Sequence, residues 1–370
     1  MLNRLIVSLF ALFLAITCDS QIRIVDKETY GAVPFAHVIN ENGKLIGTTN
    51  IDGILIKSEI FKEPVSNHSI VSIQHISYKN YQIELNTLLL GDTIFLLPNN
   101  IFLPEVTVKK RSTDPQYLAI TGYFRSYQLN NGIPKFFTDG IVVYYIPLGR
   151  KKELKNSVLH NRSFRNEKLI QQEKKRSVKM EMVCAGIPYI KAETIIQDLD
   201  KTYSVVKETA DNYRIENKNE KVGLLLRDSL NANITISIDL IAPEQKKVKT
   251  FLNYTSEILE TNIIENYSSA DIKSFSKNDL LTRKEYRKIA FKHKKENDFT
   301  EIEVIHEFYV LGKEIVYQSE LKKIEVSNHF GLIRSTNFSQ EYWAKLPKYN
   351  IPEISPNIEN LFGKELILYD

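Results

Sequence analysis

NITISIDL, residues 233–240, alternates apolar and polar side chains without a break. A second stretch, residues 300–310, alternates in the same way, and its apolar face consists of Thr300, Ile302, Val304, His306, Phe308 and Val310. A period of two is that of a β-strand with one face in the core and the other in water. These stretches therefore predict a large antiparallel sheet with one wet face.

Further apolar runs extend this sheet. Phe136–Ile146 predicts a strand, and residues 251–267 and 283–291 predict two less regular strands. Leu311-Gly312-Lys313 is expected to turn the chain, so that residues 315–321 pair back across the turn.

Two segments near the start of this region predict helices instead. Tyr117–Leu129 places apolar and small residues at spacings of three and four, and Leu169–Met182 continues a basic stretch. We therefore expect residues 116–370 to form an antiparallel β domain with one or two helices. The chain of 370 residues has room for one further domain before it.

Short apolar runs separated by turn residues fill residues 21–98. The expected strands are Ile22–Val25, Phe35–Ile39, Ile54–Ile56, Ile70–Ile73, Tyr81–Leu85 and Thr93–Leu97. Asn42-Gly43 and Asp52-Gly53 predict the hairpin turns between them, because glycine adopts positive φ without strain. Six or seven strands in so short a segment predict a small β-sandwich, and the fold class as a whole is mainly β.

Residues 21–98 also resemble a known family. Five segments carry the resemblance: VDKET at 25–29, VPFAHV at 33–38, GTTNIDG at 47–53, ISYK at 76–79 and LPEVTV at 103–108. They look like the carboxypeptidase-regulatory-like domain of bacterial envelope proteins, with Arg23 and Asn50 as two departures. The resemblance implies a seven-stranded, transthyretin-like β-sandwich in which these residues are structural.

Polar, basic and proline residues between 99 and 115 predict a linker between the two domains, with one short strand at Val106–Val108. Beyond it, YFR at 123–125 and FTDGIVV at 137–143 are similar to the opening of a C-terminal region in other envelope proteins with this sandwich. The order of helix and long sheet is also similar to that of periplasmic lipoprotein carriers, an analogy of fold order alone.

The first twenty residues predict a secretory signal peptide. Arg4 precedes a predominantly apolar run, Leu5–Ile16, which as a helix rises about 18 Å and is too short for a bilayer core of about 30 Å. Cleavage before Gln21 is the expected outcome, and lipidation of Cys18 is the alternative. We therefore expect an exported protein, periplasmic or associated with the outer membrane, with no later membrane-spanning helix.

Composition excludes several function classes. The net charge of +4, from 49 basic and 45 acidic residues, is nearly balanced and gives no reason to expect a nucleic-acid partner. Two cysteines are too few for a disulfide framework or a structural zinc site. The most basic stretch, residues 150–182, predicts a solvated helix and loop, with a surface for anionic lipid or lipopolysaccharide as the alternative.

No complete catalytic set stands out, so we expect no enzyme activity, no cofactor and no metal. A zinc carboxypeptidase needs His-x-x-Glu and a distant second His. The nearest approach is His293 and Glu296 with His306, and His306 is expected to be a hydrogen-bonded core residue. Cys184 is expected to be a buried small residue.

These inferences favour a non-enzymatic binding or scaffolding protein of the bacterial envelope. The expected partner is an envelope protein or a lipid. The alternative is a carrier that holds a lipid or a lipoprotein in a concave sheet of the C-terminal domain, and the two differ in whether the apolar sheet face is open or covered.

Overall fold

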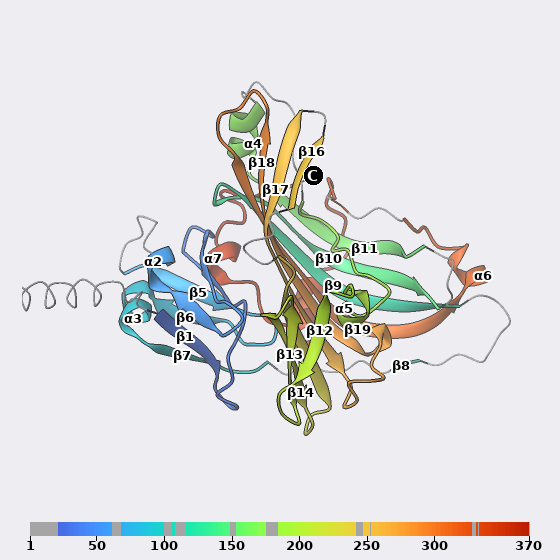
Figure 1. Cartoon of the computed structure of the whole chain (residues 1–370). Helices are drawn as coiled ribbons and strands as arrows, with labels where there is room; N and C mark the ends of the chain where they lie inside the picture. Colours follow the sequence, from blue (N-terminus) through green and yellow to red (C-terminus); the bar gives the residue numbers. More distant parts are fainter. Residues whose placement is uncertain are drawn as a thin grey trace, which may run out of the picture.

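The computed structural model describes residues 21–60, 68–99, 106–107, 116–148, 153–174, 184–241, 247–251, 253–327, 331 and 333–369. The fold is mainly β, as expected, and consists of a small two-sheet unit beside one very large sheet (Figure 1). The predicted signal peptide, residues 1–20, and Cys18 lie outside the described residues.

The N-terminal unit is a β-sandwich of a three-stranded and a four-stranded sheet, in the orders β4-β1-β7 and β3-β2-β5-β6. Its elements are β1 (Gln21–Asp26), β2 (His37–Ile39), β3 (Leu45–Thr48), β4 (Ile54–Ile56), α2 (Lys57–Ile60), β5 (Ile70–Gln74), β6 (Tyr81–Glu84), α3 (Leu85–Leu90) and β7 (Thr93–Leu96). All six predicted strands are present, and β3 is added. Gly43 and Gly53 have φ of 73° and 70°, as both predicted turns require.

The large sheet contains 13 strands, and its main path runs β12-β13-β14-β15-β17-β18-β19-β9-β10-β11-β20, with β16 on β17 and β8 on β19. Its first strands are β8 (Val106–Thr107), β9 (Gln116–Asn130), β10 (Ile133–Pro147), β11 (Lys155–Arg165), β12 (Tyr203–Lys207), β13 (Asn212–Asn217) and β14 (Glu220–Asp228). The others are β15 (Asn233–Asp239), β16 (Lys247–Phe251), β17 (Tyr254–Ser268), β18 (Leu280–His293), β19 (Thr300–Tyr317) and β20 (Ile367–Leu368).

Short helices lie between and after these strands: α4 (Glu167–Lys174), α5 (Ile195–Asp198), η2 (Lys277–Asp279), α6 (Gln318–Leu321), η3 (Tyr342–Tyr349) and α7 (Pro356–Glu359). The predicted helix at Leu169–Met182 begins slightly earlier, in α4, and residues 175–183 lie outside the described part. None of the helices in the described ranges is long and apolar enough to cross a membrane.

One face of the large sheet is covered by the chain itself. Ile234, Ile236 and Ile238 are fully buried, as their alternation predicts. They share one core with strand residues of β9 and β10 and with Ile187, Ile190 and Ile195 from residues 184–199. We call residues 184–199 the covering segment, because it fills the space between the strands that curl around it.

Along the central strands the opposite face is covered as well, which corrects the expected wet face there. Many residues of the outer strands β12, β13 and β14 stay partly or largely exposed. The sandwich contributes Ile39 and Leu45 to a core with β9, and the C-terminal residues 354–368 pack into the same core. In β9, every residue from Gly122 to Asn130 is buried, so both faces of this part of the strand are covered. Central strands of this sheet therefore behave as interior elements rather than as a half-wet surface.

Burial on both faces also explains the wrong prediction of a helix at Tyr117–Leu129. These residues belong to β9, which pairs with β10 and β19 along its whole length. A strand buried on both faces needs apolar residues at odd and even positions, so its pattern includes the three- and four-residue spacings of a helix.

The predicted turn at Leu311-Gly312-Lys313 is also wrong. β19 runs through it without reversing, and its register with β9 shifts by one residue between Val310 and Gly312. The glycine marks a bulge inside a strand instead of the end of one. The predicted linker, residues 99–115, is described only at Asn99 and at β8, which pairs in parallel with β19.

Close packing of β9 against β19 predicts that Gly122 is indispensable for stability. A Cβ atom there would lie 2.2 Å from the Phe308 ring and 2.6 Å from the Tyr309 carbonyl oxygen, whereas one at Gly312 would meet nothing within 4 Å. We expect Gly122→Ala to lower the free energy of unfolding by about 1–3 kcal/mol in urea titrations. Gly312→Ala is the matched control, and equal effects of both substitutions would contradict this packing.

Candidate functional site

The sandwich, the large sheet and the C-terminal residues meet at a group of buried charged side chains, which we call the junction. Its centre is the ion pair of Arg125 on β9 and Glu307 on β19. Arg125 also donates through Nη1 to the carbonyl oxygen of Pro352 at 2.9 Å and through Nη2 to the Tyr309 hydroxyl at 3.0 Å. The guanidinium therefore binds two strands and the C-terminal segment at once.

The electrostatics of the junction favour the charged forms of both partners. Burial alone would lower the pKa of Arg125, but the Glu307 carboxylate outweighs it and raises that pKa above its usual value. Burial would raise the pKa of Glu307, yet Arg125 and Lys284 together hold it below its usual value. The pair is thus ionised and acts as a fixed bridge.

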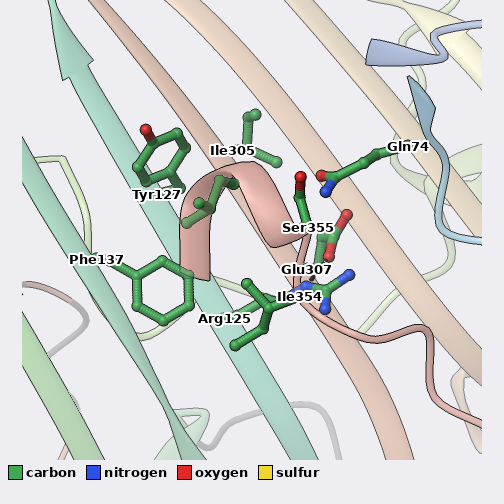
Figure 2. A pocket seen from close by; sticks show the side chains of 9 residues that line it. Gln74, Arg125, Tyr127, Phe137, Ile305, Glu307, Ile354 and Ser355 are labelled. Atoms are coloured by element: carbon green, nitrogen blue, oxygen red, sulfur yellow. Dashed lines mark hydrogen bonds and ion pairs between the residues drawn. The ribbon is translucent and has the colours of Figure 1, made fainter. Parts of the chain in front are cut away.

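A small cavity lies at this ion pair, under Gln74 of the sandwich and Ser355 of the C-terminal segment (Figure 2). Its lining residues are Gln74, Arg125, Tyr127, Phe137, Ile305, Glu307, Ile354, Ser355 and Ile358. With about 20 Å³ it has room for one water molecule, and not for an organic ligand. The cavity is therefore a packing feature of the junction.

A second charged cluster fastens the C-terminal segment beside the junction. The Asp139 carboxylate on β10 accepts hydrogen bonds from Tyr123 at 3.0 Å and from Tyr342 at 2.6 Å, and binds Arg162 on β11 at 2.6 and 3.0 Å. The Arg162 guanidinium also lies 4.0 Å from the centre of the Trp343 ring. The hydrogen bond from Tyr342 and the contact between Arg162 and Trp343 thus hold helix η3 against the sheet.

On the sandwich side, a buried lysine lies among buried side-chain nitrogens that lack a hydrogen-bond partner in the described part of the chain. His37 and Lys284 are both buried, and the Lys284 ammonium donates to the Phe35 carbonyl oxygen at 3.3 Å. Nε2 of His37 and Nε2 of Gln74 have no hydrogen-bond partner among the described residues. Burial lowers the pKa of Lys284 to about 8. Another positive charge in this layer would be costly.

His37 and His75 are neutral, because they are buried near the charge of Lys284. Burial, followed by the charge on Lys284, lowers the pKa of His37 well below 6.5, and the same two causes act on His75. The backbone of Pro34 partly offsets the effect at His75. His37 also packs edge-on against Tyr286 of β18, at 5.0 Å between ring centres.

The residues considered for zinc hydrolysis do not converge. His306 pairs across strands with Glu285, and His293 lies eight residues further along β18, about 26 Å away at roughly 3.3 Å per residue. The Glu296 carboxylate accepts a hydrogen bond from the backbone N–H of His293 at 3.0 Å. Within the described ranges, no group of three or more His, Cys, Asp or Glu side chains could hold a metal ion.

His306 instead belongs to a row of polar residues beneath the covering segment. Its Nδ1 shares a hydrogen bond of 2.8 Å with the Ser126 hydroxyl, and Glu285 is its cross-strand neighbour. Burial is the main reason that the pKa of His306 falls to about 4. Serine, histidine and acid thus lie side by side, but Ser126 is only 1% exposed, so its hydroxyl cannot reach a substrate.

This row holds the covering segment in place. The Ser126 hydroxyl accepts from the N–H of Gly186 at 3.1 Å, and the Gln128 side-chain oxygen accepts from the N–H groups of Cys184 and Ala185 at 2.8 and 3.0 Å. Cys184 is half-buried rather than fully buried, and burial raises the pKa of its thiol.

Glu265 on β17 fastens the other end of the covering segment. It binds Lys277 at 2.8 Å and Arg283 at 2.6 Å, and its second oxygen accepts from the N–H of Ile195 at 3.2 Å. Burial opposes ionisation, but Lys277 and Arg283 outweigh it and lower the pKa of Glu265 to about 2.

Scans against protein-family models, curated proteins and solved structures find no match. The resemblance of residues 21–98 to carboxypeptidase-regulatory-like domains therefore stays a prediction. What the structure adds is the division of those residues into sheets of three and four strands.

None of the charged residues of the junction was predicted from the sequence to form a site. Arg125 and Glu307 each interrupt an apolar run, in YFRSY at 123–127 and HEFYV at 306–310. A charge inside such a run is a usable signal, because a buried charge needs an opposite partner. Only the register of β9 and β19, in which Glu307 faces Arg125, identifies that partner.

We expect removal of one partner of the ion pair to be more harmful than removal of both. Arg125→Met leaves Glu307 buried without its bridge and should lower the free energy of unfolding by about 3–5 kcal/mol. The double variant Arg125→Met/Glu307→Met should be more stable than Arg125→Met in urea denaturation. Additive losses in the two single variants and the double variant would show that the pair is not coupled.

The neutral histidines predict that acid weakens the docking of the sandwich. A folded-state pKa below 6.5 gives stability that is present above pH 6.5 and is lost as the pH falls below it. Burial raises the pKa of Glu260 to about 7, so the protonation of this carboxyl adds stability as the pH falls. The contribution of the histidines is therefore measured as a difference between the histidine variants and the wild type. His37→Asn/His75→Asn should lose less stability than the wild type between pH 7 and 5 in thermal denaturation. His68→Asn, at an exposed histidine, is the control, and a wild-type slope in the His37/His75 double variant would contradict the assignment.

Proposed function

We propose that the chain is a non-catalytic binding or scaffolding protein of the bacterial envelope. The observation that carries the proposal is that buried polar and charged groups of the sheet bind other parts of the same chain. The Arg125, Asp139, Ser126–His306 and Glu265 clusters each bind a covering part of the chain to the sheet. In these four clusters, the groups that could supply acid, base or nucleophile hold covering parts of the chain in place.

The fixed position of the sandwich supports a scaffolding role. Besides the junction, the Asn357 side chain on α7 donates to the backbone oxygens of Ile39 and Ile70 at 3.0 and 3.1 Å, and Asn266 on β17 donates to Ser77 at 3.0 Å. The C-terminal segment thus holds both units. Such an arrangement presents two β surfaces at a constant angle to a partner.

The envelope assignment rests on sequence. The predicted signal peptide implies export, and the resemblance of residues 21–98 implies a transthyretin-like module of envelope proteins. The expected partner remains an envelope protein or a lipid. The sandwich of three and four strands supports this identification of the module.

Lipid carriage in a concave sheet, the alternative function, would require movement of the covering segment. The apolar face around Ile234–Ile238 is filled by Ile187, Ile190 and Ile195 in the described structure. A carrier would have to release the hydrogen bonds of Gln128 and Glu265 to that segment before a lipid could enter.

Native mass spectrometry of the protein purified from its own envelope fraction tests both functions. We expect a mature chain that begins at Gln21, recovered with a protein partner or alone and without lipid. A triacylated Cys18 would place it on a membrane leaflet and keep the scaffold proposal. A bound lipid in stoichiometric amount would overturn the scaffold in favour of the carrier, and recovery from the cytoplasm would overturn the envelope assignment.

A further inference from the structure

A three-stranded arm projects from one end of the large sheet. It consists of β16, the first residues of β17 and the last residues of β18, and β16 pairs with β17 off the main strand path (Figure 1). The backbone N–H of Lys294 donates to the carbonyl oxygen of Asn253 at 2.9 Å. The β16–β17 turn and the residues after β18 therefore lie side by side at the tip.

Large apolar side chains are exposed on this arm. Phe251 is 71% exposed and Val248 is 54% exposed. Phe251 lies opposite Tyr254 in the strand register, and the Tyr254 ring stacks on Phe291 at 5.1 Å. The cross-strand neighbour of the exposed Phe251 is therefore itself held by ring stacking.

Lysines surround these apolar residues. Lys249, Lys294 and Lys295 are exposed, and the ammonium of Lys292 lies 4.6 Å from the centre of the Phe299 ring. Two acidic residues, Glu296 and Asp298, lie nearby in the β18–β19 connection. A third acid, Glu257, is the cross-strand neighbour of Val248. Over residues 247–251, 254–258 and 289–299, five lysines against three acids leave the arm net positive.

Helix α4 lies at the same end and carries two lysines and two glutamates. Its Glu173 accepts from the side chain of Asn130 at 2.8 Å, and the N–H of the next residue, Asn131, donates to the carbonyl oxygen of Glu301 at 2.7 Å. Lys168 and Lys174 of α4 are exposed. Part of the most basic stretch of the sequence thus lies at the end that carries the arm.

We propose that the arm binds the surface of a bilayer that contains anionic lipid. An exposed aromatic side chain flanked by lysines is the chemistry of interfacial binding: the ring enters the boundary of the acyl chains, and the ammonium groups attract anionic headgroups. The proposal rests on the proposed function in one respect, namely that the protein reaches an envelope membrane. It does not depend on whether the protein is a scaffold or a carrier.

Co-sedimentation of the purified protein with vesicles tests the proposal. We expect it to sediment with vesicles of phosphatidylcholine mixed with phosphatidylglycerol and to stay in the supernatant with vesicles of phosphatidylcholine alone. Added salt should release it, since the attraction between exposed charges is screened. Equal binding to both kinds of vesicle, or to neither, would overturn the proposal.

Matched charge reversals identify the surface. Lys249→Glu/Lys294→Glu/Lys295→Glu should lower the partition coefficient by about a hundredfold, at roughly fivefold for each lysine. Lys201→Glu/Lys218→Glu/Lys273→Glu makes the same change in net charge at exposed lysines outside the arm and should lower it much less. Equal losses in the two variants would show that net charge, and not the arm, drives binding, and would overturn the proposal.

Variants of Phe251 test the apolar part. Phe251→Ser should weaken binding, whereas Phe251→Trp should retain it and give an emission that shifts to shorter wavelength when anionic vesicles are added. The same change in Phe251→Trp upon addition of a soluble acidic protein would point to a protein partner and overturn the lipid assignment. Unaltered circular dichroism spectra would confirm that each variant is folded. Vesicle binding by a protein found in the cytoplasm would refute only the envelope assignment.

Discussion

The Arg125–Glu307 ion pair is the interaction on which the arrangement of the whole molecule depends. It joins β9 to β19, the same guanidinium donates to the Pro352 carbonyl oxygen, and Gln74 of the sandwich lines the cavity beside the pair. A charge buried at this depth is tolerable only with an opposite charge and further hydrogen bonds, and both are provided here. The position of three separate parts of the chain is therefore coupled to one guanidinium group.

On the other face of the sheet, buried polar side chains likewise bind a covering part of the chain. Ser126, Gln128 and Glu265 use their polar atoms to satisfy backbone N–H groups of the covering segment, which has little regular structure to satisfy them internally. Polar residues within central strands thus act as fasteners for irregular chain. The polar groups of the central strands are therefore bonded within the chain. The ends of the strands and the turns between them remain as surfaces that can contact a partner.

Local pattern and tertiary context differ in what they specify about this sheet. The strand at Ile234–Ile238 could be identified from alternation alone, because one of its faces is apolar and the other is polar. Tyr117–Leu129 could not, because burial on both faces removes the alternation. Gly312 looked like a turn because glycine marks both turns and bulges, and only the pairing of β19 with β9 shows that the strand continues.

The amino-acid sequence by itself determined the mainly β fold, the strands and glycine turns of the sandwich, and the alternating strands of the large sheet, because each depends on neighbours within a few residues. It also contains the charges of the junction, but not their pairing. Only the tertiary structure decided that both faces of the central strands are covered, that Arg125 meets Glu307, and that Lys168 and Lys174 lie at the same end of the sheet as Lys249, Lys294 and Lys295. These contacts join residues far apart in the chain, and their partners are fixed by strand register and not by local spacing.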